Sequence, residues 1–188
     1  MTMLLDTLWT VEAQARLFRA VLAAHAYPGD VVDCRAWLGG RPAVAGVLAA
    51  LADGAVTIAD LDGSLDPVDA DLIGSRPTSS GAAAFVIASG AQPPVEGLQL
   101  CRGELLAPER GATLILICQA VGEGPMRLGL SGPGVIETGC RLALAGFDAA
   151  WLELRTEHNR QLPLGIDLVL CDGARIAALP RTTSVQVG

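Results

Sequence analysis

The stretch Gly111-Ala112-Thr113-Leu114-Ile115-Leu116-Ile117-Cys118 decides how this chain folds. Within this stretch, Ala112–Cys118 is a short, continuous apolar run rich in Leu and Ile, with Gly111 before it and Gly122 after it. A run of this length without polar alternation is typical of a strand that is buried on both faces of a sheet. The sequence therefore predicts a central strand over Ala112–Cys118, covered by other elements on both sides.

Strand signals dominate on the C-terminal side of this run. Met126–Leu130 predicts a neighbouring strand, and Phe147–Glu157 predicts a helix with an acidic face. Ile166–Leu170 and Arg175–Leu179 are apolar runs separated by a turn at Gly173, a pattern that predicts a hairpin.

Helix and strand signals alternate on the N-terminal side. Helices are predicted from a Thr10 cap to Ala26, from Pro42 to Asp53, and from Asp66-Pro67 to Ile73. Short strands are predicted at Val31–Cys34 and Val56–Ile58. This order predicts an α/β fold of one domain over residues 1–188, with a mixed central sheet and helices on both faces.

Composition excludes several classes of function. The 188 residues suffice for one domain with a real core, and the 13 basic residues are all Arg. Without Lys, the chain has neither a Schiff-base lysine nor a P-loop lysine. A net charge of -7 argues against a nucleic-acid or anionic-membrane surface.

The cysteines and the apolar segments indicate the compartment. The five cysteines are widely spaced and form no C-x-x-C, so we expect small buried thiols in a reducing compartment. No basic leader precedes the first apolar run, and no stretch has the roughly 18 apolar residues that a membrane helix needs. The sequence predicts a cytoplasmic protein.

One acidic segment has nearly the spacing of a calcium loop. Its oxygen-bearing residues are Asp60, Asp62, Ser64, Asp66 and Asp71. Such a loop needs Gly at its sixth position, where this chain has Leu65, and Pro67 follows Asp66 directly. We interpret the segment as a solvated turn that leads into a capped helix, not as a metal site.

Other searches for catalytic groups also give structural interpretations. Gly132-Pro133-Gly134 follows a strand, but Glu137 stands where a dinucleotide-binding loop has its third glycine, which favours a tight turn. His25 and His158 have no second His or Cys at ligand spacing. No G-x-S-x-G or S-x-x-K motif is present, so the sequence identifies no catalytic residue.

The C-terminal run Pro180-Arg181-Thr182-Thr183 allows two interpretations. A guanidinium and two hydroxyls beside backbone amides make a chemically sensible anion-binding site of Arg181, Thr182 and Thr183. Alternatively, Arg181 covers the end of the sheet or pairs with Asp167 in the preceding strand.

The chain as a whole resembles the PhnH family, the H subunits of the bacterial carbon-phosphorus lyase system. The densest similarity lies in four runs, Pro108–Leu116, Gly132–Val135, Leu162–Leu168 and Leu179–Thr183. Weaker similarity covers Val11–Gln14, Phe18-Arg19, Pro28-Gly29 and Leu51–Asp53. Leu162 and Ser184 depart from the family pattern, which has an aromatic residue and a histidine there.

The resemblance implies a three-layer open sandwich, similar in topology to pyridoxal-phosphate transferases but without that cofactor. It implies a homodimer when isolated and a core complex with the G, I and J subunits. That complex makes alpha-D-ribose 1-methylphosphonate 5-triphosphate from MgATP and a phosphonate, with the I subunit as the expected catalyst. The chain would then be an accessory, structural subunit of this transferase; the alternative is a phosphate- or phosphonate-binding subunit that uses Arg181 and its neighbours.

Overall fold

The computed structural model describes residues 7–136 and 140–188. Its α-helices are α1 (Val11–Ala26), α2 (Ala43–Leu51), α3 (Pro67–Ile73) and α4 (Ala150–His158). Short 3-10 helices are η1 (Thr7–Trp9), η2 (Arg35–Trp37) and η3 (Ser80–Ala82). The strands are β1 (Val32–Asp33), β2 (Thr57–Asp60), β3 (Arg76–Pro77), β4 (Phe85–Ser89), β5 (Arg102–Glu104), β6 (Ala107–Gly111), β7 (Thr113–Ile117), β8 (Ala120–Ser131), β9 (Cys140–Ala145), β10 (Asp167–Cys171), β11 (Arg175–Leu179) and β12 (Ser184–Val187). In these ranges, none of the helices is long and apolar enough to cross a membrane.

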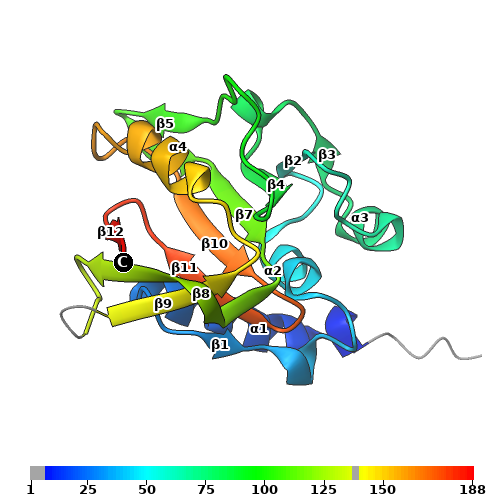
Figure 1. The fold of residues 1–188 in the computed structure, drawn as a ribbon. Helices are drawn as coiled ribbons and strands as arrows, with labels where there is room; N and C mark the ends of the chain where they lie inside the picture. Colours follow the sequence, from blue (N-terminus) through cyan, green and yellow to red (C-terminus); the bar gives the residue numbers. More distant parts are fainter. Residues whose placement is uncertain (1–6, 137–139) are drawn as a thin grey trace, which may run out of the picture.

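The main sheet is mixed, as predicted. Its strand order is β1-β11-β10-β7-β4-β2-β3. The strands from β10 to β3 pair in parallel, whereas β11 pairs antiparallel with both β10 and β1. Figure 1 shows β7 and β10 side by side in the middle of the molecule.

The predicted central strand forms β7 and separates two cores. Leu114 and Leu116 are fully buried on one face, where α4 and the small sheet of β8, β9 and β12 cover them. Ile115 is fully buried on the other face, against α1 and α2. A continuous apolar run is needed because both faces of the strand are shielded from water. Helices therefore lie on both faces of the sheet, as predicted.

The strand predicted at Met126–Leu130 has a different partner from the expected one. It belongs to β8, which pairs antiparallel with β9 and β12 in a separate sheet of order β12-β8-β9. The prediction that it neighbours the central strand was wrong, because β4 and β10 occupy both edges of β7. Leu128 and Leu130 instead belong to the core cluster that the small sheet forms with one face of the main sheet.

Local capping signals are confirmed by hydrogen bonds. The Thr10 hydroxyl accepts a hydrogen bond from the Ala13 amide at 3.3 Å and caps α1. The Asp66 carboxylate accepts from the Val68 amide at 2.8 Å and caps α3, with Pro67 at its first turn. The hairpin β10–β11 forms as predicted.

The sequence interpretation missed the hairpin β5–β6. Gly103, at φ 73°, adopts a left-handed conformation beside a register shift between Arg102 and Glu104. The hairpin therefore begins with a register shift, and its strands lack the alternation of apolar and polar residues by which a strand is predicted from sequence. The Gly165 amide donates to the Arg102 carbonyl at 3.0 Å and joins the hairpin to the loop that precedes β10.

Candidate functional site

Arg181 lies where three of the family-like runs meet. Its Nη2 donates to Asp167 Oδ2 at 2.6 Å, and its Nε lies 3.2 and 3.3 Å from the two carboxylate oxygens. Its Nη1 donates to the carbonyls of Pro108 at 2.8 Å and Pro163 at 3.2 Å. The structure therefore shows the pairing of Arg181 with Asp167, and all three guanidinium nitrogens have partners within the chain.

A close contact between two glycines completes this junction. A Cβ on Gly111 would overlap the Gly165 carbonyl oxygen and lie 2.9 Å from both Nη atoms of Arg181. A Cβ on Gly165 would in turn overlap the Asn159 side chain. Asn159 is itself fixed, because its amide group exchanges two hydrogen bonds with the Ile166 backbone, at 2.7 and 3.1 Å. The two glycines allow the strand, the loop and the arginine to approach one another.

The C-terminal loop is held from its other side by Arg155. This buried residue of α4 donates from Nη2 to the carbonyls of Pro180 at 2.6 Å and Thr183 at 2.8 Å. Burial lowers the pKa of Arg155 to about 10, and Asp167 opposes that shift. The guanidinium therefore remains charged near neutral pH.

The two threonines of the predicted anion site lie in different environments. Thr182 is exposed, whereas Thr183 is buried and its Oγ1 has no hydrogen-bond partner in the described part of the chain. Arg181 already binds a carboxylate, so an added anion would have to compete with Asp167. The structure brings the three residues together in one loop, and their use as a ligand site stays a prediction.

The junction supports an apolar projection. It fixes both strands of the hairpin β5–β6, whose tip carries Leu105 and Leu106 with 75% and 98% of their surfaces exposed. Leu162, in the loop that Arg181 holds through Pro163, is also exposed. Adjacent leucines left in water on an anchored hairpin are typical of a protein-binding surface. Sequence reasoning missed this feature, although two leucines in an otherwise polar turn were a usable signal.

The acidic segment has the structural role that was predicted. Asp60 accepts hydrogen bonds from the amides of Ser64 and Leu65, at 3.0 and 2.9 Å, and Asp62 accepts from the Ser89 amide. Asp66 caps α3. In residues 7–136 and 140–188, no group of three His, Cys, Asp or Glu side chains could hold a metal ion.

The other candidate motifs also form local hydrogen bonds within the fold. The Val135 amide donates to the Gly132 carbonyl at 3.3 Å, which closes the predicted turn, while Glu137 lies outside the described residues. Each histidine donates from Nδ1 to the carbonyl four residues earlier, His25 to Val21 and His158 to Leu154, both at 2.9 Å. The interactions fix both rings against their own helices.

Cys34, Cys118 and Cys171 behave as buried apolar groups. Burial raises the pKa of Cys34 to about 11 and that of Cys118 to about 12, and it raises the pKa of Cys171 as well. These thiols remain protonated near neutral pH and are poor nucleophiles. Cys101 is half-buried, and the side chain of Cys140 lies outside the described part of the chain.

Comparisons with known proteins confirm the family resemblance that the sequence predicted. Residues 6–186 match the family described as bacterial phosphonate metabolism protein (PhnH). The putative C-P lyase subunit protein HtxG of Stutzerimonas stutzeri is 37% identical over 180 residues, covering 96% of this chain and 89% of that protein. The alpha-D-ribose 1-methylphosphonate 5-triphosphate synthase subunit PhnH of Rhizobium meliloti (strain 1021) is 34% identical over 88 residues, covering 47% of this chain and 43% of that one.

Proposed function

Because the chain belongs to the PhnH family of bacterial phosphonate metabolism proteins, we propose that it is an accessory, structural subunit of a C-P lyase core complex. In this role it supports the formation of alpha-D-ribose 1-methylphosphonate 5-triphosphate from MgATP and a phosphonate, in the cytoplasm. Its partners are the G, I and J subunits, and the isolated chain is a homodimer. The similarity in topology to pyridoxal-phosphate transferases is part of the same proposal, and the lack of Lys excludes an internal aldimine.

The observation that carries this proposal is the exposed pair of leucines on the hairpin β5–β6. Leu106 has 98% of its surface exposed to water. The base of its hairpin is held in place by contacts with Arg181, Gly111 and Gly165. A pre-formed apolar projection loses little conformational entropy when it inserts into a partner. The surface thus supports docking onto another subunit.

Co-expression tests the assembly directly. We expect the chain to co-purify with G, I and J through a tag on I, and an absence of co-purification would refute the proposal. Leu106→Glu should weaken this association at least tenfold, because a charge cannot enter an apolar pocket without a large desolvation cost. Leu72→Glu on α3, where the leucine is 54% exposed, is the matched control and should leave assembly unchanged.

The second candidate function is a direct phosphate- or phosphonate-binding subunit that uses Arg181, Thr182 and Thr183. The observation in its favour is the Thr183 hydroxyl, which is buried without a described partner. Calorimetry with ATP and alkyl phosphonates, carried out on the unaltered chain and on Arg181→Ala, separates the two functions, because only binding at this loop should be lost with Arg181. An Arg181→Ala variant that assembles and supports full turnover would exclude the C-terminal loop as the ligand site.

A further inference from the structure

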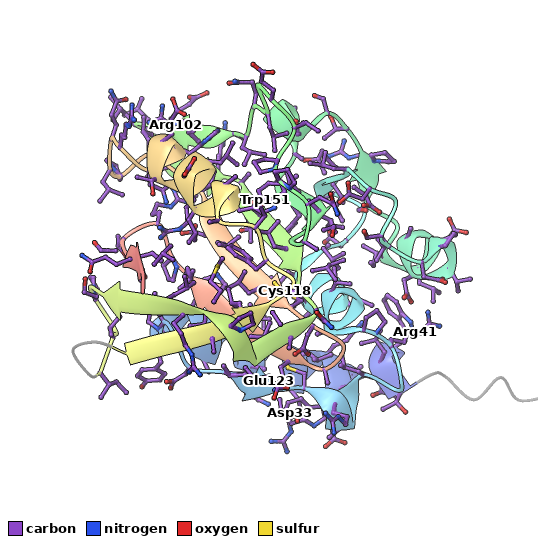
Figure 2. The ribbon with its side chains drawn as sticks, viewed as in Figure 1. Asp33, Arg41, Arg102, Cys118, Glu123 and Trp151 are labelled. Carbon is purple, nitrogen blue, oxygen red and sulfur yellow. The ribbon has the colours of Figure 1, made fainter. Side chains whose placement is uncertain are left out.

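A pocket of about 370 Å³ lies between the C-terminal half of α4 and the segment that leads into β5. Its walls include Leu98, Gln99, Arg102, Leu154, Glu157 and His158. Figure 2 shows Arg102 at the end of the molecule where β5 lies beside α4. A volume of this size is at the lower end of the range for small-molecule sites in proteins. We call it the Arg102 pocket.

The guanidinium of Arg102, a half-buried residue, lacks the hydrogen-bond partners that its buried nitrogens would normally have. Its Nε and Nη2 atoms are buried and have no hydrogen-bond partner among the described residues. No described carboxylate forms an ion pair with it, and Glu157, in the wall of the same pocket, is exposed. A buried donor without a partner costs about 1–3 kcal/mol, and more when it is charged. The fold therefore keeps a guanidinium at this pocket that has no direct ion-pair partner among the described residues.

The neighbouring polar groups leave that charge available. The Nδ1–H of His158 is occupied by the Leu154 carbonyl, at 2.9 Å. The side-chain amide of Gln99 donates to the Gly97 carbonyl at 3.3 Å, and Gln99 forms no hydrogen bond with the buried nitrogens of Arg102. An anion in the pocket would consequently meet a guanidinium that no described carboxylate pairs with directly, unlike an anion at Arg181.

We propose that the Arg102 pocket binds a small oxyanion, a phosphate, a phosphonate or a carboxylate, with Arg102 as its principal contact. A planar guanidinium suits these groups, and attraction is stronger near a partly buried charge than in bulk water. The size of the pocket and the carboxylate of Glu157 at its wall disfavour a triphosphate. This site uses a different arginine from the C-terminal loop and does not depend on the accessory role.

Thermal unfolding and calorimetry of the isolated chain test the site. Inorganic phosphate, methylphosphonate and acetate are compared with chloride at equal ionic strength, so that general screening cancels. We expect a saturable rise in Tm and a millimolar or tighter Kd for at least one of the three oxyanions. Because the chain has a net charge of -7, general anion attraction does not account for such binding. The ranking of the three identifies the source of the oxyanion, and a lack of saturable binding by all of them overturns the proposal.

Variants connect the binding to Arg102. Arg102→Gln should weaken binding at least tenfold, whereas Arg160→Gln, which removes an exposed charge just beyond α4, should change it less than twofold. Binding by Arg102→Gln within twofold of the unaltered chain would overturn the assignment. If that variant does not fold, Glu157→Gln decides, since loss of a like charge should strengthen binding two- to fivefold and unchanged affinity would contradict the pocket.

Discussion

Arg181 and Arg102 both adjoin the contact between Gly111 and Gly165, yet their guanidinium groups are in opposite states. The guanidinium of Arg181 packs against Gly111, and its three nitrogens bind one carboxylate and two carbonyls. Arg102 pairs with Gly111 through its backbone and accepts from the Gly165 amide, but its side chain has two buried nitrogens without a described partner. Charge alone therefore does not identify a binding residue. What distinguishes the two residues is whether the chain itself satisfies the guanidinium.

The largest expected effect follows from removal of the satisfied arginine. Arg181→Met should lower the free energy of unfolding by about 3 kcal/mol, because it leaves Asp167 without its ionic partner and two carbonyls without donors. Urea denaturation followed by circular dichroism measures the change. Arg160→Met, at an exposed position, is the control and should stay within about 0.5 kcal/mol. Equal stabilities of the two variants would contradict a structural role for Arg181.

A second effect tests the contact that both arginines share. Gly111→Ala should destabilise the fold by about 2 kcal/mol, since the new methyl group would overlap a backbone oxygen that cannot rotate away. At Gly173 a Cβ would meet no atom within 4 Å, so Gly173→Ala is the matched control. Thermal unfolding of both variants provides the measurement. A loss at Gly173 as large as that at Gly111 would show that glycine flexibility, and not close approach, matters.

How far the sequence predicted the fold depends on whether a signal is local. Thr10, Asp66 and the apolar run of β7 act through neighbours in the chain, and the structure confirms them. The pairing of Arg181 with Asp167 was one of the alternatives that the sequence left open. The pair forms because the antiparallel strands β10 and β11 bring these two residues together. The state of Arg102 could not be predicted, since its burial depends on α4, more than 40 residues further along the chain.

Asp172 pairs with a third arginine, Arg175, and the effect of its charge on stability can be measured by changing the pH. Burial alone would raise the pKa of Asp172, but hydrogen bonds from the amides of Ala174, Val121 and Arg175 and from the Arg175 side chain lower it overall. A carboxyl whose pKa is lower in the folded state stabilises the fold above its ordinary value of about 3.9. That stabilisation is lost as the pH falls through the folded-state pKa.

Asp172→Asn should accordingly cost about 1.5 kcal/mol at pH 7 and less at pH 3. Denaturation at both pH values measures the difference, with Asp71→Asn, an exposed change on α3, as the control. A cost that does not change with pH would mean that the shape of the side chain, and not its charge, holds the turn between β10 and β11.

The smallest expected effect, and the one of opposite sign, belongs to the unsatisfied arginine. Arg102→Met keeps much of the length of the side chain and removes a half-buried cation whose Nε and Nη2 have no described partner, so stability should stay unchanged or rise by up to about 1 kcal/mol. In urea denaturation without oxyanions, Arg102→Met should be at least as stable as the unaltered chain. Phosphate near saturation should make the unaltered chain the more stable of the two, because only a chain that retains Arg102 gains binding energy. A loss of more than about 1 kcal/mol in the absence of oxyanions would mean that Arg102, like Arg181, serves the fold. A reversal by phosphate would identify the missing partner of this guanidinium as an anion from outside the chain.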